Sequence, residues 1–308
     1  MASGNAPAHA SRDRDPVDMN DTTSTPVKTP TAAVIGAGVM GCGIAAVLAR
    51  GGHRVTLVDA TDQLAEKGVQ RSREMIDEGL RRGKYSEPEA AAARSRLSWS
   101  SSLAHVDQGL DVIVEAVPEQ EDLKRRVLVG AEEREPALLA TNTSGISIDA
   151  LATSLSEPER FLGLHFFNPV PVMPLVEIVI GHATSQEARS HALQIVEQIG
   201  KEAVVVRDAP GFASTRLGVL LGLEAIRMVE EGVAEPEDID KAMVLGYRHP
   251  IGPLRLTDIV GLDVRLDIAR NLQAAYGERF AAPELLREMV QEGRLGKKTG
   301  QGFYLWGD

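Results

Sequence analysis

His165 and Glu177 stand near the two ends of the segment HFFNPVPVMPLVEI, residues 165–178, which holds no other ionisable side chain. Histidine is the side chain that most readily gives and takes a proton near neutral pH. A carboxylate beside it would fix the imidazole tautomer and balance the charge that forms on proton uptake. The segment therefore predicts a general acid–base pair, His165 with Glu177, if its prolines turn the chain back on itself. A packed histidine at a strand end explains the same residues, and residue types alone leave both readings open.

A glycine loop precedes this segment in the chain. GAGVMG fits G-x-G-x-x-G with Gly36, Gly38 and Gly41, follows an apolar strand-like run and opens a helical pattern. The next strand-like run, RVTLVDA, ends in Asp59. This is the context in which such a loop binds a dinucleotide diphosphate at a helix N-terminus, with the acid on the ribose hydroxyls. An acid at this place repels a 2′-phosphate, which predicts NAD over NADP, whereas the loop alone also allows FAD.

The composition limits the partners that this chain can have. Its 308 residues carry a formal net charge of −11, and the pI is near 5.2, which argues against nucleic acid or an anionic membrane as main partner. The single cysteine, Cys42, rules out an internal disulfide and fits a reducing cytoplasm. The sequence shows no secretory signal and no apolar run of the roughly 20 residues that cross a bilayer. Residues 1–30 are polar and are expected to form a disordered tail.

Strand-like and helical patterns alternate up to about residue 208. We expect buried strands around AAVIGAG, RVTLVDA, LDVIVEAVPE, ALLATNTSGIS, RFLGLHFFNP, LVEIVIG and KEAVVVRD. Residues 62–100 are expected to be helical, in two helices broken between Gly83 and Pro88. This alternation predicts an α/β fold, a Rossmann-like doubly wound sheet over residues 31–208. Residues 209–308 read as a smaller all-α domain, apart from a final strand-like GFYLW.

Seven motifs in one order carry a resemblance to a known family. GAGVMGCGIA, IVEAVPE, TNTSGISI, HFFNPVPVMPLVEI, DAPGF, HPIGPLRLTDIVGLD and GKKTGQGFY together resemble the 3-hydroxyacyl-CoA dehydrogenases, from residue 36 to residue 304. The resemblance implies an NAD-dependent oxidation of an (S)-3-hydroxyacyl-CoA thioester, with 3-hydroxybutyryl-CoA as the expected substrate, and the reverse reaction. It also implies the monofunctional type, a place in fatty acid metabolism, and a homodimer formed through the helical domain.

The resemblance also assigns roles to individual residues. Ser144 would touch both the substrate and the cofactor, beside the pair of His165 and Glu177. Further cofactor contacts are expected within the glycine loop, after two of the strands and near the C-terminal end of the chain. Those positions are Val39, Met40, Glu119, Lys124, Asn168 and Lys298.

Two positions depart from the family pattern, and one cluster of cations is ambiguous. Gly145 stands where a second serine is common after Ser144, and Thr215, in DAPGFASTR, stands where an active-site asparagine is usual. Thr215 offers one hydroxyl in place of an amide and stays a candidate site residue. The cations Arg81, Arg82 and Lys84 could hold the phosphates of coenzyme A, or could form an ordinary solvated helix face.

Two other functions fit parts of the same sequence. A dehydrogenase of a free hydroxy acid, such as a sugar acid, would use the same fold and the same acid–base pair. A non-catalytic NAD-binding protein would need the glycine loop but no base, because fold does not fix function. Retention of Ser144, His165, Asn168 and Glu177 favours an enzyme, and no motif calls for a metal.

Overall fold

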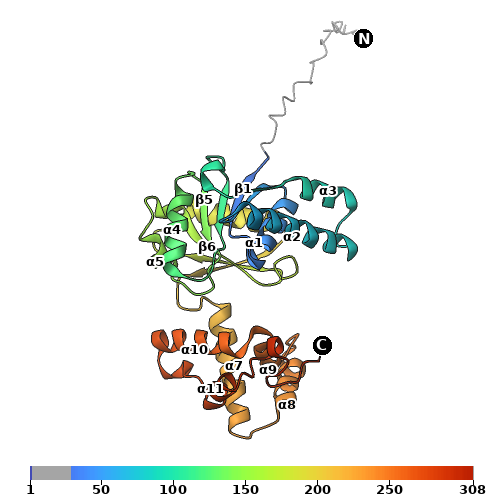
Figure 1. Ribbon diagram of the computed structural model, residues 1–308, viewed down its shortest axis with the longest axis vertical. Coiled ribbons are helices and arrows are strands. Elements are labelled where there is room, and N and C mark those ends of the chain that lie inside the picture. The colour runs from blue at the N-terminus through green and yellow to red at the C-terminus, as the bar shows by residue number, and fades with distance from the viewer. Residues whose placement is uncertain (2–28, 308) are drawn as a thin grey trace.

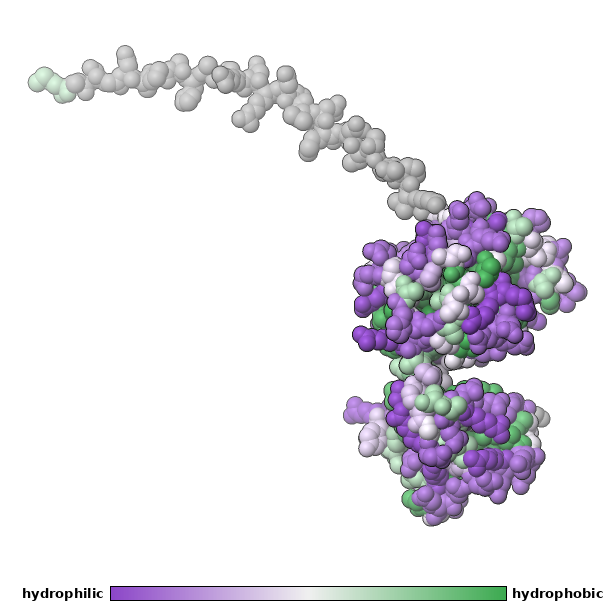
Figure 2. Space-filling model, turned by 90° about the vertical axis from the view of Figure 1, so that its left-hand side faces the viewer, coloured by the Kyte–Doolittle hydropathy of each residue, from purple (hydrophilic) through white to green (hydrophobic). Residues whose placement is uncertain are grey.

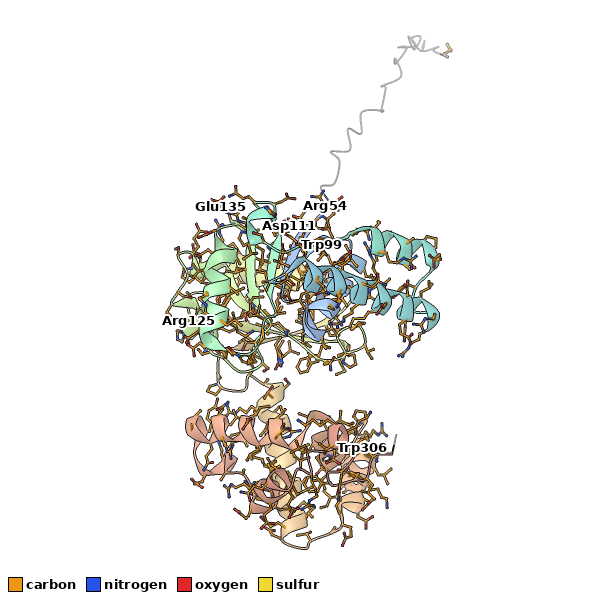
Figure 3. All side chains as sticks on the ribbon, in the orientation of Figure 1. Arg54, Trp99, Asp111, Arg125, Glu135 and Trp306 are labelled. Carbon is orange, nitrogen blue, oxygen red and sulfur yellow. The ribbon has the colours of Figure 1, made fainter. Side chains whose placement is uncertain are left out.

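The structure is a computed structural model that describes residue 1 and residues 29–307. Most of the expected disordered tail, residues 2–28, therefore lies outside the described residues. The described chain forms two lobes, a sheet with helices on both faces and a helical lobe that begins with α7 (Figure 1). The two lobes meet at a narrow waist (Figure 2). Each lobe carries one tryptophan, Trp99 in the sheet lobe and Trp306 in the helical lobe (Figure 3).

The strands of the described chain join in one eight-stranded sheet with the order β3-β2-β1-β4-β5-β6-β7-β8. Neighbouring strands run parallel except at one place, because β7 is antiparallel to β6 and β8 is parallel to β7. The strands are β1 (Thr31–Ile35), β2 (Arg54–Val58), β3 (Leu97–Ser100), β4 (Val112–Glu115), β5 (Leu138–Thr141), β6 (Phe161–Phe166), β7 (Leu175–Ile180) and β8 (Glu202–Arg207).

Helices cover both faces of this sheet, as the alternation in the sequence predicts. They are α1 (Val39–Arg50), α2 (Asp62–Arg81), α3 (Glu87–Ser95), α4 (Glu121–Glu132), α5 (Ile148–Ala152) and α6 (Gln186–Gln198). Successive strand residues point to opposite faces, so Val34 packs with the core under α1 and α6, whereas Ile35 packs with the core under α4 and α5. Because both faces of the central strands are covered, β1, β4, β5 and β6 are apolar at all but one position each.

A third core holds the helical lobe together. Its helices are α7 (Ser214–Glu230), α8 (Pro236–Lys241), a π-helical turn η3 (Ala242–Gly246), α9 (Pro253–Val260), α10 (Leu262–Tyr276) and α11 (Glu284–Gln291). Buried apolar side chains of α7, α9, α10 and α11 pack against one another, with Leu223, Leu254 and Leu286 fully buried among them. The predicted fold class, a doubly wound sheet followed by an all-α lobe, is confirmed.

Two local predictions are wrong. Residues 97–100 are the edge strand β3 and not helix, because they pair in parallel with β2 after α3 has ended at Ser95. The C-terminal GFYLW does not form a strand but only isolated bridges, one of them between Gln301 and Leu305. Neither difference changes the position of a predicted site residue. Among the described helices, none combines the length and the apolar character needed to span a membrane.

Candidate active site

The glycine loop lies between β1 and α1 and has the geometry that a diphosphate needs. Gly36 has a φ of +108°, and a side chain there would meet the Ala116 carbonyl oxygen at 2.6 Å. A Cβ at Gly41 would lie 1.7 Å from the Gly36 oxygen, whereas a Cβ at Gly38 would meet nothing within 4 Å. Packing therefore requires the first and third glycines, and the second leaves open space in front of the backbone.

That open space faces the N-terminal end of α1. Gly38 is the N-cap of this helix and offers no side-chain cap, and the first turn, with Val39 and Met40, holds no acid. Free N–H groups and the positive end of the helix dipole are then available to an anion. These residues fit a dinucleotide phosphate.

Asp59 follows β2 and reaches the same loop. Its carboxylate accepts a hydrogen bond from the Ala37 N–H at 2.6 Å and another from the Ala60 N–H at 2.7 Å. The side chain is only partly buried, so it braces the loop and still offers lone pairs to a ligand. This is the place at which a ribose hydroxyl would be bound.

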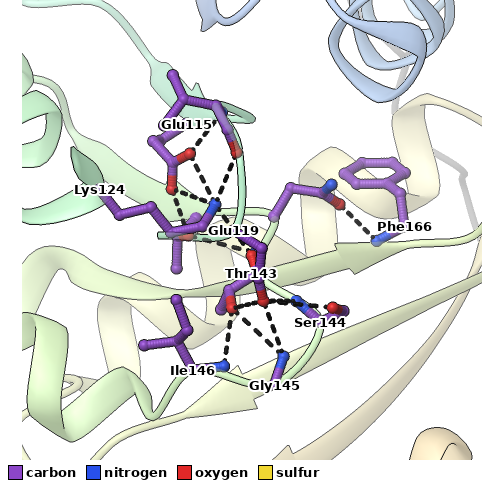
Figure 4. A network of polar contacts seen from close by, with 11 residues as sticks. Glu115, Glu119, Lys124, Thr143, Ser144, Gly145, Ile146 and Phe166 are labelled. Atoms are coloured by element: carbon purple, nitrogen blue, oxygen red, sulfur yellow. Dashed lines mark hydrogen bonds and ion pairs between the residues drawn. The ribbon is translucent and has the colours of Figure 1, made fainter. Parts of the chain in front are cut away.

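A buried ion pair lies behind the crevice at the ends of β4 and β5. Glu115 and Lys124 are 0% and 1% exposed, and their charged groups are 2.8 Å apart (Figure 4). The Glu115 carboxylate also accepts from the Val117 N–H and the Thr141 hydroxyl, each at 2.6 Å. Lys124 donates its remaining bond to the Val117 carbonyl at 3.2 Å. The partners of this buried charge pair thus come from β5, through Thr141, and from the loop between β4 and α4, through Val117.

Glu119 joins this ion pair to the turn that carries Ser144. One of its oxygens lies 3.4 Å from the Lys124 ammonium. The other accepts from the Thr143 hydroxyl at 2.6 Å, the Ser144 N–H at 2.9 Å and the Gly145 N–H at 3.2 Å (Figure 4). Burial raises the pKa of the Glu119 carboxyl, but the hydrogen bond from Thr143 and the charge of Lys124 outweigh it and leave the pKa below its ordinary value. An ionised Glu119 therefore holds the serine turn in place.

His165 and Glu177 face each other across β6 and β7. The two residues are register partners in the antiparallel pair, and His165 Nδ1 lies 2.8 Å from Glu177 Oε2. They are 6% and 1% exposed. The rings of Phe167 and Phe212 pack against the imidazole, with centroids 4.5 and 5.7 Å away. The predicted fold-back is thus present, and it leaves the second imidazole nitrogen, Nε2, free of the carboxylate.

Glu177 has three further donors, all from the start of α7. The N–H groups of Ala213 and Ser214 bind Oε1 at 3.2 and 2.8 Å, and the Ser214 hydroxyl binds Oε2 at 2.7 Å. Burial raises the pKa of the Glu177 carboxyl, but the hydrogen bonds from His165 and Ser214 outweigh it and leave the pKa below its ordinary value. The carboxylate is therefore ionised and fully bonded.

A hollow of about 360 Å³ brings many of the predicted site residues together. Met40, Glu119, Ser144, His165 and Asn168 line it, together with Ala116, Val117, Asn142, Phe166 and Phe167. Asn142 and Ser214 are among the side chains at the site that were not predicted from the sequence. Asn142 accepts from the Phe166 N–H at 2.9 Å and so ties β5 to β6, and Ser214 bonds Glu177. Asn142 lies inside the quoted motif TNTSG, whereas Ser214 had no signal besides its place next to Thr215.

Other predicted residues lie outside this hollow. Lys124 is enclosed behind Glu119, and the Lys298 ammonium pairs with both Asp263 oxygens at 2.5 Å in the helical lobe. Thr215 lies in the first turn of α7, and its hydroxyl has no hydrogen-bond partner in the part of the chain that the structure describes.

The three candidate coenzyme A cations lie where α2 ends. Arg82 and Lys84 line a second cavity, of about 560 Å³, together with the apolar side chains of Val47, Ile76 and Val170. Asn168 lines both this cavity and the hollow around His165, so the two adjoin. Arg81 and Arg82 both pair with Glu78, at 2.5 and 2.6 Å. Arg82 and Glu78 line the cavity, whereas Arg81 does not.

Comparison with known proteins covers nearly the whole described chain. The model of the 3-hydroxyacyl-CoA dehydrogenase NAD-binding domain matches residues 31–209, and the model of the C-terminal domain of the same family matches residues 211–306. A Bacillus subtilis protein named "Probable 3-hydroxybutyryl-CoA dehydrogenase" is 41% identical over 274 residues, which are 88% of this chain and 95% of that protein. The Mycobacterium tuberculosis 3-hydroxybutyryl-CoA dehydrogenase is 41% identical over 278 residues, 89% and 97% of the two chains.

Solved structures agree with this assignment. The crystal structure of (S)-3-hydroxybutyryl-CoA dehydrogenase from Ralstonia eutropha superposes with a TM-score of 0.86 at 38% identity, covering 91% of this chain and all of that one. The two domain models of the family match one after the other along the chain, and these relatives align over nearly their full length. The chain therefore belongs to the 3-hydroxyacyl-CoA dehydrogenase family and is an NAD-dependent oxidoreductase.

Proposed function

We propose that this enzyme interconverts (S)-3-hydroxyacyl-CoA and 3-oxoacyl-CoA thioesters, with 3-hydroxybutyryl-CoA as its substrate. The observation that carries this proposal is the buried pair of His165 and Glu177, which lies at a hollow lined also by Ser144 and Asn168. The names of the relatives support the four-carbon thioester. A protein that only binds NAD has no use for a buried imidazole held by an ionised carboxylate.

In this proposal His165 is the general base. Glu177 accepts a hydrogen bond from Nδ1–H, so the neutral imidazole keeps its Nε2 lone pair for the hydroxyl proton of the substrate. It also balances the imidazolium charge that forms, and acid–base help of this kind contributes about 10²–10⁴ in rate. When bound, NAD supplies the hydride acceptor. In the reductive direction the protonated His165 donates to the 3-oxygen.

Neighbouring side chains hold the two reactants. Ser144, whose turn is fixed by Glu119, has its hydroxyl 3.2 Å from the same Glu119 oxygen, and in the proposed reaction this hydroxyl turns to donate to the 3-oxygen of the thioester. Gly36, Gly38, Gly41 and the first turn of α1 take the NAD diphosphate, and Asp59 takes the adenosine ribose. Asn168 and Glu119 border the nicotinamide side of the hollow.

The cavity next to Asn168 is proposed to receive the coenzyme A arm. Its apolar lining suits a pantetheine chain, and Arg82 and Lys84 at its edge suit the phosphates. A third hollow shares Lys84 and Arg50 with this cavity and adds Arg96, so cations outnumber the acids Glu78 and Glu89 that line the two hollows. Local positive charge of this kind allows a chain with a net charge of −11 to bind an anionic substrate.

A homodimer formed through the helical lobe is part of the proposal. Large apolar side chains are exposed on this lobe, which supports a covered face. They include Leu217, Leu245, Tyr247, Ile259, Val260 and Val264. A cytoplasmic location also stays a proposal and rests on the single, unpaired Cys42.

The test is turnover by purified protein with NAD and (S)-3-hydroxybutyryl-CoA, followed by NADH absorbance. The controls are NADP, the R thioester and a free hydroxy acid. We expect NADH only with the S thioester, and loss of turnover with retained NADH binding in His165→Gln and Glu177→Gln. Turnover of the free acid alone would move the enzyme to the rival hydroxy-acid reaction, and near-normal turnover in either variant would refute the acid–base pair.

A further inference from the structure

The serine just before Thr215 touches the acid–base pair more directly than Thr215 does. The Ser214 hydroxyl donates to Glu177 Oε2 at 2.7 Å, and this is the oxygen that lies 2.8 Å from His165 Nδ1. One carboxylate oxygen therefore serves two donors, the imidazole and the hydroxyl. Ser214 comes from the first helix of the helical lobe, 37 residues away in the chain.

The backbone around Ser214 explains why the hydroxyl is a separate contribution. Ala213, the N-cap of α7, has no side chain that could cap the helix. Glu177 Oε1 replaces such a cap by accepting the N–H groups of Ala213 and Ser214. Those two bonds remain whatever side chain stands at position 214. The hydroxyl is the only bond to Glu177 that depends on the identity of this residue.

The described elements packed around Glu177 bring one titratable side chain, His165, into contact with its carboxylate. On β6 the register partner of Glu177 is His165, and on β8 it is the apolar Val204. On α7 the cation Arg216 is stacked on the Tyr276 ring, 4.0 Å from its centroid, and hydrogen-bonded to its hydroxyl. Within the described residues, His165 is the titratable group bonded to this carboxylate.

We propose that Ser214 is a positioning residue for the reaction, whose hydroxyl fixes Glu177 Oε2 and takes up part of its negative charge. Fixing the oxygen holds the imidazole plane, and sharing the charge weakens the pull of the carboxylate on an imidazolium. Ser214 thereby tunes how strongly Glu177 stabilises the imidazolium that forms on His165 during oxidation. The kinetic part of this inference rests on the proposed function.

Removal of the hydroxyl should have two effects. Without the hydroxyl, the negative charge on Oε2 would stabilise the imidazolium more strongly. The acidic limb of the pH profile of kcat/KM in oxidation should therefore move to higher pH, by about half a unit. Oε2 would also be held by one bond fewer and would orient the imidazole less firmly, so we expect kcat to fall about tenfold, equivalent to about 1.4 kcal/mol in the barrier. KM for NAD should not change, because Ser214 is not among the residues that line the hollow.

The test uses the full-length chain with Ser214→Val and Ser214→Thr, two variants of equal shape of which only the second keeps a hydroxyl. Ser185→Ala is the control for loss of a serine hydroxyl at a helix start away from the site, because the Ser185 hydroxyl accepts from the Ala188 N–H at 3.1 Å at the start of α6. We expect the pH shift and the loss of kcat in Ser214→Val, near wild-type behaviour in Ser214→Thr, and a wild-type pH profile in Ser185→Ala.

Overlapping pH profiles for wild type and Ser214→Val would overturn the proposal, as would equal losses in the valine and threonine variants. Histidine-selective NMR gives a readout that does not need the substrate. The His165 signal, assigned with His165→Gln, should titrate at a higher pH in Ser214→Val than in wild type. If wild type does not turn over the thioester, the proposed function fails, and this NMR titration alone decides whether Ser214 acts on His165.

Discussion

Replacement of Lys124 by methionine should cost much stability and little cofactor affinity. Its side chain is 1% exposed, and its ammonium donates to both Glu115 oxygens and to the Val117 carbonyl. Removal of one partner of a buried ion pair typically costs about 3–5 kcal/mol, because the other charge is left uncompensated. Glu115 would keep its bonds from Val117 and Thr141, so we expect a loss near 3 kcal/mol, at the lower end.

The change in NAD affinity in Lys124→Met should be smaller than the change in stability, because Lys124 reaches the cofactor site only through Glu119. This side chain lies 3.4 Å from the ammonium and is 42% exposed. A partly exposed pair of this kind contributes up to about 1 kcal/mol. We therefore expect KM for NAD to rise less than about tenfold. A direct contact between Lys124 and the cofactor, as the family resemblance implies, would give a larger rise.

Unfolding in urea, followed by tryptophan fluorescence, measures the stability. A Trp306→Phe background leaves Trp99, on β3, as the reporter of the sheet lobe. Arg126→Met is the matched control, since Arg126 is an exposed cation two residues further along α4. The double variant Glu115→Gln with Lys124→Met should lose less than the sum of the single losses. A loss below about 1 kcal/mol in Lys124→Met, together with a large rise in KM for NAD, would refute the structural role.

Three further predictions concern single side chains. Asp59→Ser should raise KM for NAD about tenfold by removing a charged hydrogen-bond acceptor, and an unchanged value would remove Asp59 from the ribose site. Lys84→Ala should raise KM for the CoA thioester and not for NAD, with a smaller effect at high salt; equal effects on both substrates would contradict the assignment of the cavity. Burial, reinforced by Arg50, lowers the pKa of Lys201 from 10.5 to about 8. The unfolded chain then binds more protons between these pH values, so stability should rise with pH across this window, and Lys201→Met should flatten the rise in urea midpoints. Parallel curves for the two proteins would show that Lys201 does not titrate in this way.

Features that depend on local spacing could be predicted from the sequence. The glycine loop and Asp59 belong to one βαβ unit, whose pattern is contiguous in the chain. His165 and Glu177 are joined by a short connection between adjacent antiparallel strands, so their separation in the sequence already limits their separation in space. For both features the motif contains its own structural context.

Features that depend on distant packing could not be predicted in the same way. β3 is a four-residue edge strand with two serines, and its conformation comes from pairing with β2. The burial of Lys124 depends on how α4 crosses the end of β4, although the sequence shows only a lysine in a charged helix. Ser214 meets Glu177 only because the helical lobe begins directly over β7. In each case a partner far away in the chain decides the role of the residue.

Carboxylates act in this site chiefly as internal anchors for backbone N–H groups. Asp59 holds the glycine loop, Glu119 holds the Ser144 turn, and Glu177 holds the start of α7, each through one or more N–H donors. An ionised acceptor binds an N–H about twice as strongly as a neutral one, so each anchor fixes a loop without a larger core. Each carboxylate is also partly neutralised by these donors, which lowers its repulsion towards a phosphate. An acidic chain can thus form a rigid site for two anionic ligands, because its site acids are used to order the loops that bind them.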